Sequence, residues 1–169
     1  IYLGQAKLIE PDPTSSGLLE LVAMAKKYMK GFHVRANADS PQGAALALSF
    51  GADGLGLCRT EHMFFGDDRI NVFREMVLSD SREDRVAALK KLLPMQKKDF
   101  YGIFKAMAGK EVTIRLLDAP LHEFLPHNED ELKAFLTYLE KVRGKKFQKA
   151  EILARIDSLA EFNPMLGHR

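Results

Sequence analysis

Three arginines have side chains and positions that suit them to bind an anion. Two of them end apolar runs, and the third ends the sequence. Arg59 ends the run LGLCR, Arg115 ends VTIR, and Arg169 is the last residue of the sequence. A guanidinium group matches phosphate or carboxylate with two parallel hydrogen bonds. Burying it is costly unless an anion or a carboxylate meets it. We therefore expect Arg59, Arg115 and Arg169 to line one anion pocket.

A structural salt bridge is the plainer interpretation of Arg59 and Arg115, whereas the pattern around Arg169 does not allow the two interpretations to be compared. Arg59 has Asp39 and Glu61 as nearby candidate partners, and spacing alone does not decide between a salt bridge and a ligand site. Asp118 follows Arg115 by three residues, but an extended strand places the two on opposite faces, so a direct pair is expected to be awkward. Both arginines come late in their strands, which favours a ligand site.

Strand and helix signals place these arginines within an α/β pattern. Residues 33–39 and 55–59 are predicted strands, and an alanine-rich helix from about 41 to 50 lies between them, with Ser40 as its N-cap and Pro41 at its first position. Such a compact βαβ unit implies parallel pairing. Residues 112–117 are the third predicted strand.

The rest of the chain reads as helical. A first helix is expected at 17–29, capped by Ser15 or Ser16. Pro94 is expected to break or kink the insertion between the second and third strands, and residues 121–127 to form a loop. The further helices are expected at 70–78, 82–93, 96–108, 129–142 and 147–159, with Ser81 and Asn128 as N-caps.

This order of elements predicts an α/β fold, the N-terminal portion of a (β/α)₈ TIM-type barrel with a helical insertion between the second and third strands. A complete barrel needs eight strands and roughly 250 residues. The 169 residues here would therefore form an incomplete barrel. The sequence has no initiator methionine and begins in a strand-like run, which predicts a piece of a longer polypeptide. Open sheet edges would then be covered by a larger structure or by self-association.

Composition excludes some classes of protein. The formal net charge of +2 argues against a nucleic-acid protein. No apolar run approaches the roughly 18 residues of a membrane helix, and no signal peptide is evident. The single cysteine, Cys58, excludes an intrachain disulfide and fits a reducing compartment.

Several residues that suggest chemistry have simpler interpretations. The run GADGLG precedes its strand, so it is not a dinucleotide fingerprint; its second and third glycines are expected to allow close packing. His62, His122, His127 and Glu61 match no recognised spacing of metal ligands and are interpreted as hydrogen-bonding or surface groups. Cys58 is interpreted as a small buried hydrophobe rather than a nucleophile.

Longer motifs resemble a known family. The stretches VRANAD, FGADGLGLCRTEHMFF, LLPMQKKDFYGIFKAM, VTIRLLDAPLHEFLP and NPMLGHR closely resemble the pyruvate, phosphate dikinases of the PEP-utilising enzyme family, from about residue 34 to 169. That family has an arginine after the glycine-rich strand, another in the next strand and a third in N-P-x-L-G-x-R, which match Arg59, Arg115 and Arg169. Ala119 departs from the usual LDPPLHEF and leaves Arg115 in place.

The resemblance implies a function for each part of the chain. Residues 1–16 would be the end of the central phosphohistidine domain and a linker, and residues 17–169 the first part of the barrel that binds phosphoenolpyruvate (PEP) and pyruvate. Arg59, Arg115 and Arg169 would hold the phosphoryl group, with Asp118 and Glu61 in support. No catalytic residue and no metal ligand is assigned to this segment; the ligands of Mg²⁺ and the catalytic cysteine are expected outside it.

The implied reaction interconverts ATP, phosphate and pyruvate with AMP, pyrophosphate and PEP through a phosphohistidine, so the full-length transferase would also bind ATP. Its expected partners are PEP or pyruvate, its own central domain and a second subunit, with no nucleic acid and no membrane. The compartment would be the cytoplasm, a plastid or a glycosome. This segment alone is expected to be inactive. The alternatives are PEP synthase, Enzyme I of the sugar phosphotransferase system, and a non-catalytic phosphate-binding or assembly module.

Overall fold

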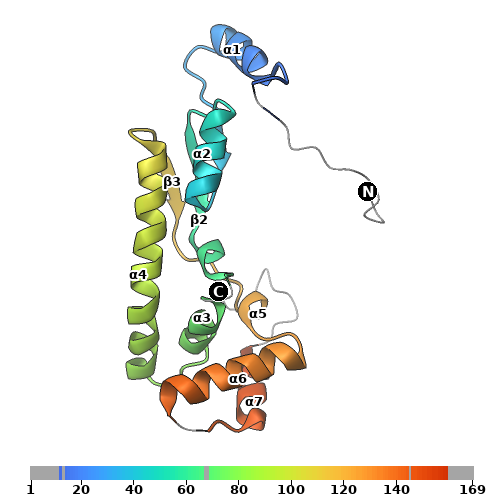
Figure 1. The fold of residues 1–169 in the computed structure, drawn as a ribbon, viewed down its shortest axis with the longest axis vertical. Coiled ribbons are helices and arrows are strands. Elements are labelled where there is room, and N and C mark those ends of the chain that lie inside the picture. Colours follow the sequence, from blue (N-terminus) through green and yellow to red (C-terminus); the bar gives the residue numbers. More distant parts are fainter. Residues whose placement is uncertain (1–11, 13, 67–68, 145, 160–169) are drawn as a thin grey trace, which may run out of the picture.

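A parallel sheet of three strands forms the upper middle of the molecule (Figure 1). The computed structural model describes residues 12, 14–66, 69–144 and 146–159. The strands lie in the order β1 (Arg35–Asn37), β2 (Gly54–Arg59) and β3 (Val112–Arg115), and both pairings are parallel. The predicted βαβ unit and the α/β class are therefore confirmed, although β1 and β3 are shorter than the predicted strands.

Helices make up most of the remaining structure. Among the described residues between β2 and β3, every regular element is a helix, which agrees with the predicted helical insertion. The bounds are α1 (Leu18–Tyr28), α2 (Pro41–Ser49), the 3₁₀ helix η1 (Thr60–Phe64), α3 (Ile70–Val77), α4 (Arg82–Met107), α5 (Leu121–Phe124), α6 (Glu129–Arg143) and α7 (Lys149–Leu159).

Three helices begin where their capping residues predict. The side-chain oxygens of Ser40, Ser81 and Asn128 each accept a hydrogen bond from the backbone N–H three residues later, at 3.1, 3.0 and 2.9 Å. Each bond satisfies a donor that the first turn of a helix leaves without a partner. The cap of α1 was predicted wrongly: neither Ser15 nor Ser16 caps it, and Gly17 occupies the N-cap position in a left-handed conformation.

Pro94 does not end a helix, contrary to the expected break between 93 and 96. α4 runs from Arg82 to Met107 with Pro94 inside it. Proline removes one helical N–H and leaves the carbonyl of Lys90 without that donor. Both residues are exposed, so water can satisfy the carbonyl. Packing along both ends of α4 then favours one continuous helix.

The loop predicted at 121–127 contains the short helix α5. Its single turn is held by the N–H of Glu123, which donates to the carbonyl of Pro120 at 3.0 Å. Phe124 is completely buried and lies against Phe73, with ring centroids 4.3 Å apart. The burial of this aromatic ring, which no local pattern reveals, accounts for the ordered turn.

Two apolar cores lie along the molecule, and α4 contributes to both (Figure 1). The sheet core lies where α2 and α4 pack on the strands. Its buried residues are Ala38, Ala44, Ala47, Leu55, Cys58, Met63, Ile103 and Met107. The helical core lies among α3, α5, α6 and α7. Its buried residues are Phe64, Val72, Phe73, Val77, Leu78, Leu92, Ala119, Phe124, Leu125, Leu132, Phe135, Leu139 and Ile152.

Two glycines let the strands approach closely, as the sequence predicts. A Cβ atom on Gly54 would lie 2.7 Å from the carbonyl oxygen of Glu111, and one on Gly56 would lie 3.1 Å from the Cβ of Arg35. Both distances are tighter than ordinary contacts, so glycine is needed on each side of β2. No helix in the described part of the chain is long and apolar enough to cross a bilayer.

Candidate functional site

Arg59 and Arg115 lie side by side at the carboxyl edge of the sheet. They are register partners at the ends of β2 and β3, and their side chains are 31% and 35% exposed. The hydroxyl of Thr60 donates to the carbonyl oxygen of Arg115 at 3.1 Å and links the first turn after β2 to the end of β3. The structure therefore brings together two of the three arginines that the sequence selects. Arg169 lies outside the described residues.

Arg115 is held by two carboxylates. It forms an ion pair with Glu61, whose side chain is only 4% exposed, and its Nη1 atom lies 3.7 Å from Oδ2 of Asp118. The expectation that Asp118 would be awkwardly placed is wrong, because β3 ends at Arg115 rather than at residue 117 and the chain can turn. Within the described residues, Glu61 Oε2 and Arg115 Nε are buried without a hydrogen-bond partner.

Arg59 is positioned through its backbone more than through its guanidinium group. Its N–H donates to Oδ1 of Asp39 at 2.5 Å, whereas its Nη1 lies 4.0 Å from Oδ2 of the same residue. A separation of 4.0 Å is too long for a hydrogen bond. Of the two predicted salt-bridge partners, Asp39 is only at the limit of an ion pair, and Glu61 pairs with Arg115 instead.

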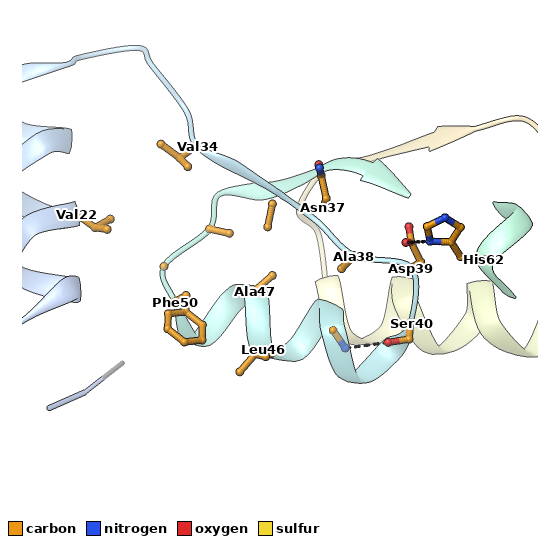
Figure 2. Close-up of a pocket in the computed structure, with 14 residues that line it drawn as sticks. Val22, Val34, Asn37, Ala38, Asp39, Ser40, Leu46, Ala47, Phe50 and His62 are labelled. Atoms are coloured by element: carbon orange, nitrogen blue, oxygen red, sulfur yellow. Dashed lines mark hydrogen bonds and ion pairs between the residues drawn. The ribbon is translucent and has the colours of Figure 1, made fainter. Parts of the chain in front are cut away.

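His62 joins the same group from η1. Its Nδ1 atom lies 2.9 Å from Oδ2 of Asp39, and its side chain is 44% exposed (Figure 2). Both residues line the polar end of a groove of about 710 Å³, together with Asn37 and Ser40. The opposite end of this groove is apolar and lies against α1 and α2. The hydrogen-bonding role expected for His62 is thus observed.

Cys58 lies beneath this edge and takes no part in its polar contacts. It is completely buried in the sheet core. Burial, with a smaller contribution from the negative charge of Asp39, raises the pKa of the Cys58 thiol to about 11. A thiol of this kind is a poor nucleophile near neutral pH, because the thiolate is the reactive form. The interpretation of Cys58 as a buried hydrophobe agrees with this.

Two features of the site were not evident from sequence. The 3₁₀ turn η1, which begins directly after Arg59, directs Glu61 towards Arg115 and His62 towards Asp39. A polar run after a strand was visible, but the direction of each side chain was not. Among the described residues, no group of three or more histidine, cysteine, aspartate or glutamate side chains is placed to hold a metal ion.

Ligands of open α/β sheets bind outside the carboxyl ends of the strands, where Arg59 and Arg115 lie. Two half-buried arginines in register, of which Arg115 is held by carboxylates, suit an anion that approaches from that edge. The fold and the site together define an α/β protein with a candidate anion-binding site at the carboxyl edge of its parallel sheet.

Comparison with known proteins gives the family. Residues 15–169 match the model of the PEP-utilising enzyme, PEP-binding domain. The chain aligns over its whole length with the pyruvate, phosphate dikinases of Treponema pallidum and Giardia intestinalis, at 63% and 51% identity. Pyruvate, phosphate dikinase 1, chloroplastic, of Arabidopsis thaliana is 48% identical, also over the whole chain. The chain belongs to the PEP-utilising enzyme family. It spans 19%, 18% and 17% of the length of these three relatives.

Proposed function

We propose that this chain is part of a pyruvate, phosphate dikinase and supplies phosphoryl-binding arginines to its PEP/pyruvate site. The full enzyme would interconvert ATP, phosphate and pyruvate with AMP, pyrophosphate and PEP through a phosphohistidine. Arg59, Arg115 and Arg169 would hold the phosphoryl group, and Glu61 and Asp118 would support Arg115. The identity of 63% over the whole chain with a relative of that name supports this choice within the family.

The observation that carries the proposal is the register of Arg59 and Arg115 at the carboxyl ends of β2 and β3. Negative charge on a phosphoryl group in transfer is spread over several oxygens, and catalysis depends mainly on fixed cations around them. Adjacent strands place the two guanidinium groups at one edge without the entropy cost of ordering a flexible loop. The edge of the sheet thus provides the positioning that such a transfer requires.

Glu61 and Asp118 would fix the orientation of the Arg115 side chain. An arginine without partners samples many rotamers and loses that freedom when it binds a ligand. The ion pair with the buried Glu61 restricts it before the ligand arrives. The two carboxylates also offset the positive charge, so a third cation at Arg169 would strengthen binding of a doubly charged phosphoryl group.

We place residues 17–169 in the first part of a (β/α)₈ barrel, and residues 1–16 at the end of the central phosphohistidine domain and its linker. The parallel strands and the crossover helix support this placement. Leu116 and Leu117, directly after β3, are 85% and 50% exposed, and Val34 before β1 is 58% exposed. Further barrel strands would cover such apolar positions beside β1 and β3.

Mg²⁺ is implied by the proposed reaction, and the residues at this edge do not fit it as ligands. Magnesium prefers near-octahedral coordination with carboxylate oxygens and water. Here Asp39 is bonded to His62 and to the backbone of Arg59, and Glu61 is paired with Arg115. We therefore place the magnesium ligands in another part of the full-length enzyme. The proposed homodimer and a cytoplasmic or organellar compartment also concern the full-length enzyme.

The test is the substitution Arg115→Met in the full-length protein. We expect the rate of conversion of PEP to pyruvate to fall by roughly 10³-fold or more, because methionine keeps the apolar stem and removes the charge. The matched control is Arg82→Met, on the exposed first turn of α4, which should change the rate by less than about twofold. A folded Arg115→Met protein with turnover within tenfold of wild type would favour a non-catalytic module.

A further inference from the structure

We propose that His62, held by Asp39, is an additional ligand of the anion at this site and binds it as an imidazolium. This inference rests on the proposed function and extends it, because it adds a proton-dependent group to a set of arginines that stay charged. A histidine changes its charge between about pH 5 and 8, whereas an arginine does not. The affinity of the site for an anion would therefore depend on pH.

The contact with Asp39 decides how His62 is presented. Nδ1 lies 2.9 Å from Oδ2 of Asp39, so a proton on Nδ1 is donated to the carboxylate. The second ring nitrogen, Nε2, has no hydrogen-bond or ion-pair partner among the described residues, and the side chain is 44% exposed. A carboxylate that fixes one imidazole nitrogen sets the direction of the other. Nε2 is thus oriented and available to a ligand.

His62 is close to the arginine that defines the site. The same oxygen of Asp39 lies 2.9 Å from His62 Nδ1 and 4.0 Å from Arg59 Nη1. Arg59 and His62 therefore flank one carboxylate at the carboxyl edge of the sheet. Asp39 and His62 line the polar end of the groove (Figure 2). A phosphoryl group has three outer oxygens and can contact an arginine and an imidazolium that lie this close together.

The charged groups beside His62 are Asp39 and, at the end of β2, Arg59. Glu61 lies next to His62 in the chain, but its charge is paired with Arg115. A doubly negative ligand beside Arg59 and His62 would add attraction for the imidazolium. By linkage, ligand binding takes up a proton when the free histidine is neutral, so affinity falls as pH rises.

A purely structural role for His62 is the competing interpretation. The Asp39–His62 contact also joins the turn after β1 to η1 and would hold these segments together without any ligand. Two substitutions separate the roles. In His62→Asn the side-chain amide can still donate to Asp39 but does not reach outward. In His62→Gln an uncharged amide reaches approximately to the place of Nε2.

The experiment measures sulfate as a competitive inhibitor against PEP in the full-length protein, between about pH 6 and 8. Sulfate keeps its double charge throughout this range, whereas a phosphate ester loses a proton near pH ~6 and would obscure the result. For wild type we expect the inhibition constant to rise roughly tenfold over the range, as one charge-assisted hydrogen bond is lost. Both variants should show a nearly flat profile, and His62→Asn should bind sulfate more weakly than wild type at pH 6.

A wild-type slope in His62→Asn or His62→Gln would overturn the proposal and leave His62 with the structural role. Thermal unfolding of each variant checks that it is folded, and the slope of either variant alone decides the question. Arg59→Met provides the separate test of the proposed function. If sulfate does not compete with PEP, or if Arg59→Met leaves its inhibition unchanged, the anion site itself is wrongly placed. If Arg59→Met abolishes inhibition and the His62 variants behave as wild type, only this inference fails.

Discussion

The helical core and the sheet core of this chain differ in what they bury. The helical core contains Phe73, Phe124 and Phe135, all almost completely inaccessible to solvent. The sheet core has no aromatic residue among its fully buried members and is filled by side chains such as Leu55, Ile103 and several alanines. Large aromatic side chains contribute most to core energetics. The helical core is therefore expected to contribute more to stability than the sheet core.

The charged groups of the two regions also differ, and those of the helical region are the more buried and more fully paired. Glu75 in α3 is 2% exposed, and its oxygens accept from Lys91, Tyr138 and Arg143 at 2.7 to 3.0 Å. Burial, the hydrogen bond to Glu75 and the charge of Glu75 raise the pKa of Tyr138. The charged groups around Glu75 thus satisfy one another.

The charged groups at the sheet edge are left more open. Arg59 and Arg115 are about one-third exposed, and the side chain of His62, which lines the groove, is 44% exposed. A polar group that is buried and fully bonded stabilises its surroundings, but it has no donor left for a ligand. The comparison teaches that the charged groups around Glu75 are buried and paired, whereas those at the sheet edge are left accessible to a ligand.

The largest effect in this comparison is expected from Glu75→Ala. Removal of this carboxylate leaves Lys91 and Arg143 without their buried partner, so the local free energy of unfolding of α3 and α6 should fall by about 3–5 kcal/mol. Hydrogen exchange in the full-length protein measures the loss helix by helix. The control Glu129→Ala removes an exposed partner of Lys149 and should cost about 1 kcal/mol or less. Equal loss of protection in β2 and β3 would contradict the division into two regions.

A smaller effect is expected from Glu61→Gln at the sheet edge. Glutamine keeps the shape and can accept one hydrogen bond from Arg115, but it removes the buried charge that orients the guanidinium group. Turnover of the full-length enzyme should fall roughly 10- to 100-fold, because a misplaced guanidinium group weakens binding of the transition state more than it lowers the stability of the fold. Steady-state kinetics measures this, with Glu131→Gln, the partner of Arg74 in the helical region, as the control. Equal losses in both variants would mean that the sheet edge is not distinct in function.

The smallest effect concerns Cys58. Its thiol has a pKa of about 11 in the folded protein and 9.0 as the ordinary value. Because the folded protein retains the proton longer than the unfolded chain, stability is unaffected below about pH 9 and declines between about pH 9 and 11. Unfolding of wild type and Cys58→Ala across this range measures the difference. If the two proteins lose stability in parallel, the buried thiol makes no contribution of this kind.

Local signals predicted much of the secondary structure correctly. Ser40, Ser81 and Asn128 cap helices as predicted, and Gly54 and Gly56 in β2 allow the close strand contacts that were expected. These features depend on residues a few positions apart in the chain. Pro94 was misjudged for the same reason, since its local preference was outweighed by packing along α4.

The contacts within the candidate site were less predictable. Sequence spacing selected Arg59 and Arg115 but left Asp39, Glu61 and Asp118 as alternative partners. The assignment of Glu61 to Arg115 rather than to Arg59 follows from η1, a turn that alternation along a strand does not reveal. Leu55 and Cys58, three positions apart in β2, are both buried in the sheet core, and the pairing of β2 with β3 is irregular between them.

The sequence by itself indicated that Arg59 and Arg115 come late in strands of an α/β fold, because helix caps and the βαβ spacing are set by nearby residues. Only the tertiary structure decided that Asp39 binds both the backbone of Arg59 and the ring of His62. That contact joins residues 20 and 23 positions apart. It depends on the register of β1 against β2 and on the direction of the turn after β2, which are fixed when the strands pack together.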